Sequence, residues 1–213
     1  MTRSFVLSLK PLYPFLWSVL AFTPLAFFPK GSVFERLNRL HHPFLDHLFR
    51  WSTYLGDASY AVVLLLFFLY KKPLKWAFGF TLGFAFHALF VHLFKQWLAQ
   101  GVLRPYGYYS SLSQTDQFHW IEGVSMKLLN SFPSGHTTTA FFFASFFACY
   151  FHNKYAHLVL LLLAFLAGIS RVYLGQHWFV DVYAGSLFGI ASSVLALGVV
   201  WAFPKNWHHR KWL

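Results

Sequence analysis

Six stretches of mostly apolar residues follow one another along the chain, separated by polar or proline-containing segments. They cover residues 12–28, 54–70, 74–94, 134–151, 157–173 and 182–203. A helix needs about 20 apolar residues to cross the hydrocarbon core of a bilayer, and fewer where protein covers its ends. The pattern therefore predicts an all-α protein, built as a bundle of six transmembrane helices.

Two segments between these stretches are longer than simple turns. Residues 30–53 carry apolar side chains at near-helical spacing, which predicts an amphipathic helix lying in the membrane interface. Residues 95–130 form the longest polar stretch, and loops of this length are often functional. No internal repeat or low-complexity tract interrupts the chain, so we expect residues 1–213 to form a single domain.

The composition supports a membrane protein. Of the 213 residues, 57% are hydrophobic and only 11% are charged, and the chain has one cysteine. So few charges would not cover the surface of a soluble domain, in which roughly a quarter of the residues are charged. High hydrophobicity excludes a disordered chain, and the single cysteine excludes a scaffold held by disulfide bonds.

The formal net charge of +11 points to lipid rather than to nucleic acid as the partner. No basic run exceeds two residues, and the charges lie between apolar stretches. Nine of the 17 Lys and Arg residues lie in the short segments on the side of the chain termini, and eight are spread over the longer segments opposite. The positive-inside rule then predicts cytoplasmic termini in a bacterial inner membrane, with the long loops facing the periplasm.

Three clusters of polar residues fall at helix ends on the same side of this predicted bundle. They are Lys95 with Arg104, then Ser134-Gly135-His136, then Ser170-Arg171 with His177 and Asp181. Lys and Arg side chains bind phosphate oxygens, and a glycine at a helix N-terminus lets an anion approach the free N–H groups. The clusters predict a phosphate-binding site at one membrane face.

The spacing of His177 and Asp181 points to catalysis at that site. Residues four apart lie on one face of a helix, so the carboxylate can contact the imidazole. Such a contact fixes the tautomer and leaves the other ring nitrogen free to act as a nucleophile or base. His136 can supply an acid. The chemistry implied is phosphoryl transfer through a covalent histidine intermediate, without a metal ion. Asp57, which follows Gly56, could cap the second predicted helix near this site.

His41, His42 and His47 offer an alternative site, because together with Asp46 they could bind a metal ion. Spacing alone does not show the geometry that a metal site requires. A polar helix face at the interface explains these residues better.

Together the three clusters resemble the signature of the type 2 phosphatidic acid phosphatase (PAP2) superfamily, which includes vanadium haloperoxidases and glucose-6-phosphatase. Its Pro-Ser-Gly-His and Ser-Arg-x5-His-x3-Asp motifs match without substitution, within a family-like core at residues 51–203. The first motif departs, since eight residues separate Lys95 from Arg104 where the family has six. In a regular helix two extra residues turn a side chain by about 200°. Either a non-helical stretch around Gly101 restores the aim, or one cation is misassigned.

The resemblance implies a role for each matching residue. His177 would attack phosphorus, Asp181 would hold and polarise His177, and His136 would protonate the leaving oxygen and later activate water. The phosphate oxygens would be bound by Lys95, Arg104, Ser134, Gly135, Arg171 and Ser170. The resemblance implies no metal and no other cofactor.

The expected function is hydrolysis of a lipid phosphomonoester or diphosphate within the membrane. Candidate substrates are undecaprenyl diphosphate, phosphatidylglycerol phosphate or phosphatidic acid, and a lipid A phosphate. The motifs bind the phosphate that all of these share, so they do not select one. Two alternatives stay open: a phosphotransferase that moves the phosphate to another lipid or sugar, and a non-catalytic lipid-binding or transport protein. The sequence does not indicate an oligomeric state.

Overall fold

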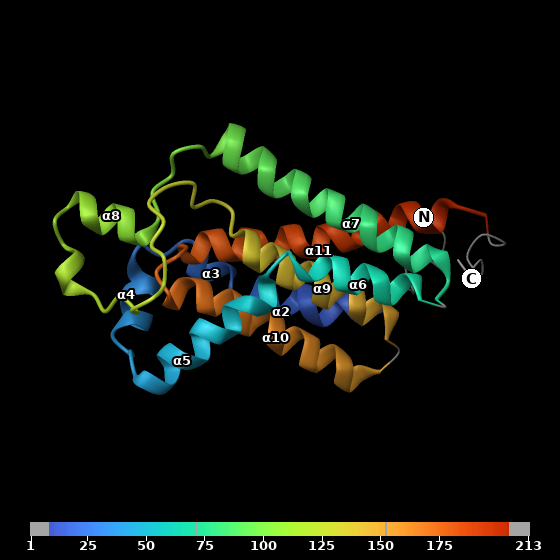
Figure 1. Cartoon of the computed structure of the whole chain (residues 1–213), viewed down its shortest axis with the longest axis horizontal. Helices are drawn as coiled ribbons and strands as arrows, with labels where there is room; N and C mark the ends of the chain where they lie inside the picture. The colour runs from blue at the N-terminus through green and yellow to red at the C-terminus, as the bar shows by residue number, and fades with distance from the viewer. Residues whose placement is uncertain (1–8, 71, 152, 205–213) are drawn as a thin grey trace.

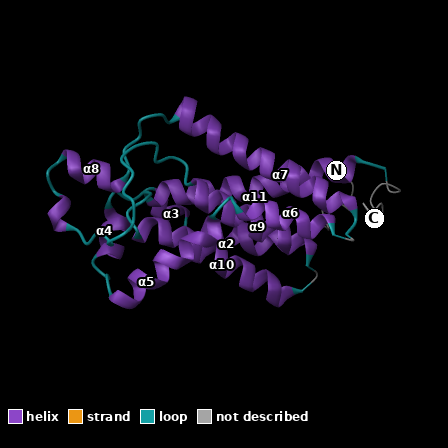
Figure 2. Cartoon of the chain, in the orientation of Figure 1, coloured by secondary structure: helices purple, strands orange, loops and turns teal. Residues whose placement is uncertain are grey.

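The computed structural model describes residues 9–70, 72–151 and 153–204, and within them helices are joined by loops and turns without a β-strand (Figure 2). The prediction of an all-α protein is confirmed. The helices are η1 (Lys10–Leu12), α2 (Tyr13–Ala21), α3 (Thr23–Ala26), α4 (Ser32–Asn38), α5 (Pro43–Ser52), η2 (Thr53–Gly56), α6 (Tyr60–Leu69), α7 (Leu74–Leu93), the π-helix η3 (Phe94–Leu98), α8 (Pro105–Ser111), η4 (Thr115–Gln117), α9 (Gly135–Tyr150), α10 (Lys154–Tyr173) and α11 (Phe179–Ala202).

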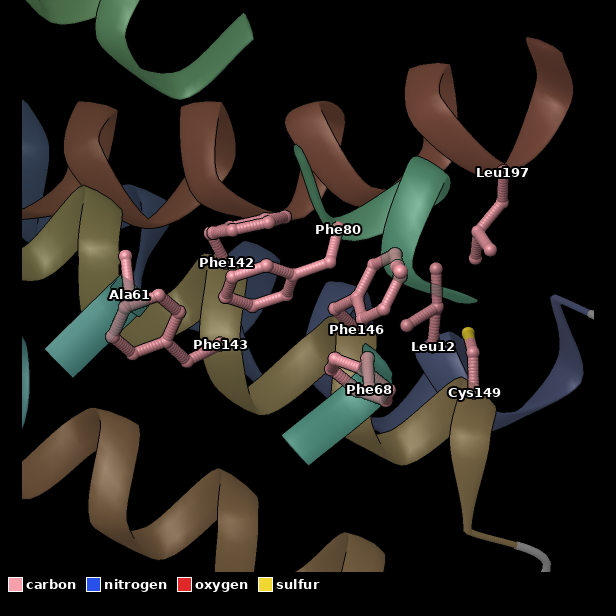
Figure 3. Packing of buried hydrophobic residues seen from close by; sticks show 10 residues of the cluster. Leu12, Ala61, Phe68, Phe80, Phe142, Phe143, Phe146, Cys149 and Leu197 are labelled. Carbon is pink, nitrogen blue, oxygen red and sulfur yellow. The ribbon is translucent and has the colours of Figure 1, made fainter. Parts of the chain in front are cut away.

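Helix α9 is the centre of the bundle, and helices α7, α10 and α11 pack around it (Figure 1). Most of its side chains are buried, and its aromatic residues form the core of the protein. Phe142 and Phe146 pack against Phe80 of α7 and Phe68 of α6, with ring centroids 5.3–5.8 Å apart (Figure 3). This contact accounts for part of the high phenylalanine content, which fills the core as well as the outer surface.

Two glycines bring α11 unusually close to α9. A Cβ atom on Gly189 would lie 2.5 Å from the carbonyl oxygen of Thr138, and one on Gly185 would lie 2.8 Å from that of Ser134. A small residue at every fourth position lets two membrane helices approach backbone to backbone. Because Asp181 lies one turn before Gly185 on α11, this close approach also sets its distance from the start of α9.

Buried polar side chains connect the same helices. The hydroxyl groups of Ser145 on α9 and Ser193 on α11 lie 2.7 Å apart. Thr139 on α9 lies 2.9 Å from the Nε2 atom of His87 on α7. Hydrogen bonds between helices stabilise packing where the surroundings are apolar and water is scarce.

Six spans are confirmed only in part. By length and composition, three helices of the described residues can cross a membrane: Leu74–Leu98, Lys154–Tyr173 and Phe179–Ala202. A fourth is possible if Pro43–Gly56 and Tyr60–Leu69, bent by 50°, form one span. The predicted span at residues 12–28 is instead divided into short helices. Pro24, in the first turn of α3, has no N–H to continue the hydrogen bonds of α2.

The outward-facing surfaces of α6 and α10 are apolar. Large apolar side chains of α6 and α10 are exposed, among them Val62, Val63, Leu66, Leu158, Val159 and Leu162. Exposed apolar side chains in such number are typical of a surface in contact with lipid.

The segment expected to form one amphipathic helix contains two helices, α4 and α5. Pro43 begins α5, and the preceding His42 caps it by accepting a hydrogen bond from the N–H of Phe44 at 3.2 Å. Phe34 of α4 is buried against Tyr109 and Trp178, so this side of α4 packs on protein. The interfacial position of the segment stays a prediction.

The histidines of this segment form hydrogen bonds and ring contacts. Asp46 binds the Nε2 atom of His119 at 2.9 Å and accepts a hydrogen bond from the Tyr173 hydroxyl at 2.6 Å. The rings of His41 and His119 stack with centroids 4.4 Å apart. In the described part of the chain, no three or more His, Cys, Asp or Glu side chains form a group that could hold a metal ion. The cluster attaches the loop around His119 to α5.

Several basic residues that determine the predicted orientation lie outside the described residues. They are Arg3, Lys71, Lys205, Arg210 and Lys211.

Candidate active site

The predicted site residues come together at one end of the bundle. Helix α7 ends, α9 begins, α10 ends and α11 begins on the side that carries α8 (Figure 1). Segments that are more than 80 residues apart in the sequence therefore meet here, as expected if their helix ends share one membrane face.

Asp181 lies in the first turn of α11, where its carboxylate is held from two directions. Its Oδ2 atom accepts hydrogen bonds from the backbone N–H of Trp178, at 2.9 Å, and from the hydroxyl of Ser131. The Nδ1 atom of His177 lies 3.4 Å from the same oxygen. That distance exceeds an ordinary hydrogen bond, and Nδ1 has no hydrogen-bond partner among the described residues. The Asp181 carboxylate therefore lies next to Nδ1, and only 1–2% of either residue is exposed.

The other ring nitrogen of His177 faces a cation. Nη1 of Arg104 lies 3.1 Å from Nε2 of His177. A guanidinium can only donate, so Nε2 accepts with its lone pair and the ring proton is on Nδ1, toward Asp181. Burial, followed by the charges of Arg104, Arg171 and Lys95, lowers the pKa of His177 well below its ordinary value. The lowered pKa favours a neutral imidazole, and the lone pair on Nε2 faces Arg104.

Arg104 also fastens two loops around His177. Its guanidinium donates to the carbonyl oxygens of Leu129 at 2.9 Å, Gln176 at 2.8 Å and Asn130 at 3.3 Å. Only 4% of the residue is exposed, and burial lowers its pKa. These three acceptors show that Arg104 orders the loops as well as adding positive charge.

The unusual spacing between Lys95 and Arg104 is taken up by irregular backbone. Lys95 lies in the π-helix η3, where the N–H of Ala99 donates to the carbonyl oxygen of Phe94 at 2.7 Å. Gly101 then adopts a positive φ of 77°, which favours glycine. The chain thus leaves helical geometry before Arg104, and the two cations lie within electrostatic range of each other.

Ser134 begins α9 and ties it to α11. Its hydroxyl oxygen accepts a hydrogen bond from Thr137 Oγ1 at 2.8 Å and caps the helix, and its N–H donates to the carbonyl oxygen of Asp181 at 3.0 Å. A Cβ on Gly135 would meet only Val91, at 3.7 Å. The space beside the first turn of α9 is therefore open, and the half-buried His136 follows directly.

Arg171 and Ser170 differ in what they can offer an anion. Arg171 donates to the hydroxyl of Thr53 through Nη1, and its buried Nε atom has no partner among the described residues. An unpaired buried N–H of this kind can donate to an anionic ligand. The hydroxyl of Ser170 donates to the carbonyl oxygen of Ala167 in its own helix at 2.7 Å. Its hydrogen is used there, so a contact between Ser170 and phosphate stays a prediction.

Sequence reasoning missed three residues of this site. Ser131 holds Asp181, Thr53 holds Arg171, and Lys127 acts electrostatically on Lys95 and His136. All three lie in loops or at helix ends without a periodic pattern. Of the three, only Ser131 had a signal in the sequence, which is its position three residues before Ser134.

The assembled site can bind an anion and attack it. Lys95, Arg104 and Arg171 supply positive charge, and the start of α9 adds backbone N–H groups. His177 offers a neutral nucleophile, and His136 offers a second titratable group.

Comparison with known proteins agrees with these motifs. The family model described as the PAP2 superfamily matches residues 74–205. The bacitracin transport permease protein BcrC of Bacillus licheniformis is 49% identical over 82 residues, which cover 38% of this chain and 38% of that protein. The putative undecaprenyl-diphosphatase YbjG of Escherichia coli K12 is 34% identical over 119 residues, or 54% of each chain. The matches thus span about half or less of these two relatives.

The fold also has a solved counterpart. The crystal structure of LpxE from Aquifex aeolicus superimposes with a TM-score of 0.66 and 28% sequence identity. The superposition covers 79% of this chain and 94% of that one.

Proposed function

Because the chain belongs to the PAP2 superfamily, we propose that this integral membrane protein is a lipid phosphatase that acts through a phosphohistidine. The observation that carries the proposal is the state of His177. Arg104 approaches Nε2 at 3.1 Å, so the lone pair of Nε2 faces the cations while Nδ1–H faces Asp181. A histidine that attacks through Nε2 must carry its ring proton on Nδ1, and the negative charge of a phosphate group requires cations beside it.

In the first half of the proposed reaction, Nε2 of His177 attacks phosphorus as the bond between phosphorus and the leaving oxygen breaks. His136 gives its proton to that oxygen. Asp181 stabilises the positive charge that develops on the imidazole of His177. Lys95, Arg104 and Arg171, with Ser134 and the N–H of Gly135, bind the phosphate oxygens, and Ser170 is a weaker candidate.

In the second half, a water molecule attacks the phosphohistidine. His136 takes a proton from the water, and the P–N bond breaks with its electron pair returning to Nε2. Phosphate leaves, and both histidines regain their starting protonation. Every proton and electron pair is accounted for by the two histidines and water, so we propose a reaction without a metal ion.

For the substrate, we propose undecaprenyl diphosphate first. Support comes from the similarity to a putative undecaprenyl-diphosphatase over 54% of this chain. Phosphatidylglycerol phosphate or phosphatidic acid ranks next and a lipid A phosphate third, since the same cations would bind each. We further propose a bacterial inner membrane as the location, with the site facing the periplasm.

A second candidate function is transport or lipid binding without catalysis, which the name of the Bacillus licheniformis relative favours. The complete set of His136, His177 and Asp181 argues against it. A phosphotransferase would use the same first half and replace water by another acceptor.

The test is phosphate release by the purified protein in detergent. Undecaprenyl diphosphate, phosphatidylglycerol phosphate, phosphatidic acid and lipid A would be compared, each with and without EDTA and with an added alcohol acceptor. We expect release that EDTA does not reduce and that His177→Ala abolishes. In a second measurement, the enzyme is quenched with alkali during turnover, because alkali preserves phosphohistidine. The denatured protein should then carry phosphate that is released by acid.

Three outcomes would contradict the proposal. Folded protein without release from any lipid supports the non-catalytic alternative. Transfer to the alcohol without release to water supports a phosphotransferase. Equal activity of His177→Ala would exclude His177 as the nucleophile.

A further inference from the structure

The turn between α5 and α6 forms one side of the site. It consists of η2 and the residue after it, Asp57. Thr53 at its start accepts the hydrogen bond from Arg171. Gly56 at its end is buried against the backbone of His136, because a Cβ there would lie 2.3 Å from the carbonyl oxygen of His136. Both ends of this short turn therefore touch residues of the site.

The contact of Gly56 determines where Asp57 lies. Only a residue without a side chain fits that close to the first turn of α9, so the backbone of the next residue is also held beside His136. The Oδ1 atom of Asp57 accepts a hydrogen bond from the N–H of Ser59 at 2.9 Å, which orders the carboxylate. Its negative charge is within electrostatic range of His136.

Three cations of the described residues also act on His136. Arg171 from α10, Lys95 from η3 and Lys127 from the loop before α9 all act on the imidazole. Each of the three cations disfavours the protonated, positively charged form of His136. The carboxylate of Asp57, which follows Gly56 beside His136, acts on the imidazole with the opposite sign.

We propose that Asp57 is a positioning residue that stabilises the protonated form of His136, so that this histidine can act as the acid of the reaction. The inference rests on the proposed phosphatase function. His136 must hold a proton before the leaving oxygen takes it, and must accept one from water afterwards. Beside three cations, a half-buried imidazole without a nearby anion would give up that proton too early to deliver it.

The substitution Asp57→Asn tests the charge while keeping the structure. Asparagine offers the same acceptor to the N–H of Ser59, so the turn is preserved and only the charge is lost. The substitution Asp57→Ser also removes the charge and keeps an oxygen that can accept the hydrogen bond from the N–H of Ser59. The substitution Asp57→Glu keeps the charge. Asp116→Asn, which removes an exposed carboxylate in η4, is the matched control.

The readout is kcat as a function of pH for two substrates. The alkoxide that leaves phosphatidic acid needs a proton, whereas the nitrophenolate of p-nitrophenyl phosphate leaves without one. We expect Asp57→Asn to lower kcat for phosphatidic acid about tenfold and to move its alkaline limb about one unit to lower pH. The rate on p-nitrophenyl phosphate should change little, and Asp57→Glu should restore most of the loss.

The other outcomes are equally definite. Equal losses on both substrates, or the same loss in Asp57→Glu, would make Asp57 a purely structural cap and overturn the inference. Unchanged kinetics in both uncharged variants would overturn it as well. A wild-type enzyme that is inactive on all four lipids of the phosphate-release panel would instead reject the proposed function, so the two failures are distinguishable.

Discussion

Nη1 of Arg104 bridges the Nε2 atom of His177, at 3.1 Å, and the carbonyl oxygen of Gln176, the residue before it, at 2.8 Å. One guanidinium therefore controls both the ring and the backbone of the proposed nucleophile. Its remaining nitrogens bind the carbonyl oxygens of Leu129 and Asn130, which draws the loop before α9 toward the same point.

Replacing Arg104 by lysine should show how much of its effect on catalysis depends on the geometry of the guanidinium rather than on its charge. A lysine keeps the charge but lacks the planar fork that reaches several acceptors at once. We expect kcat to fall about a hundredfold in phosphate-release assays. The exposed Arg39→Lys is the control and should leave the rate unchanged. A rate close to that of the wild type in Arg104→Lys would mean that charge alone suffices.

Ser131→Ala should affect both stability and catalysis. The hydroxyl of Ser131 donates to the buried carboxylate of Asp181, and its loss leaves that oxygen with one fewer donor. We expect thermal unfolding in detergent to show a loss of about 1–3 kcal/mol. We also expect kcat to fall about tenfold, because a less constrained Asp181 holds His177 less well.

Ser145→Ala provides the matched comparison. It removes a buried hydroxyl group that bonds Ser193 in the middle of the bundle, away from the site. Its stability should fall by a similar amount while kcat is retained. Equal effects of the two variants on kcat would argue against a special role for Ser131.

His177 should make the protein less stable in acid. Its pKa in the folded protein lies well below the value of about 6.5 expected for the unfolded chain, chiefly because the ring is buried. The unfolded chain therefore binds a proton first as the pH falls below about 6.5, and that favours unfolding. The contribution of His177 is complete above this pH and decreases by up to about 1.4 kcal/mol per unit below it.

Thermal unfolding of the wild type and of His177→Gln between pH 7.5 and 5 would measure this contribution. The wild type should lose more stability on acidification than the variant, whose side chain does not titrate. Parallel curves for the two proteins would show that His177 is not held in its neutral form.

Gly189→Val should disrupt the site from a distance. The added side chain would meet the carbonyl oxygen of Thr138, so α11 must move away from α9. We expect a loss of about 2 kcal/mol or more in thermal unfolding and a large loss of phosphate release, since Asp181 moves with α11. Ala191→Val, on the half-buried side of the same helix, should cost less in both measurements.

The proposed orientation can be tested by cysteine labelling. In a Cys149→Ser background, Asp116→Cys places a thiol at the site end of the bundle, and Lys154→Cys places one at the opposite end. A membrane-impermeant maleimide should label the first in intact spheroplasts and the second only after lysis. The reverse result would place the site in the cytoplasm.

Local pattern in the sequence was enough to predict an all-α protein and to name the residues of the candidate site. Apolar stretches interrupted by prolines and charges predict helices, because that information lies within one or two turns of the chain. The motifs around His136, His177 and Asp181 could be assigned to one face because alternate helix ends return to the same side. The length of each helix was less predictable: residues 12–28 are apolar enough to span, yet Pro24 ends α2 early.

Only the tertiary structure decided which side chains meet. Arg104 and His177 are 73 positions apart, Ser131 and Asp181 are 50 apart, and no periodicity links either pair. These contacts depend on the separation of α9 and α11, which Gly185 and Gly189 set by letting two backbones touch, and on the irregular turn at Gly101. The sequence by itself determined the chemical groups, because these are properties of single residues. Their geometry depends on packing between distant segments, which no local pattern records.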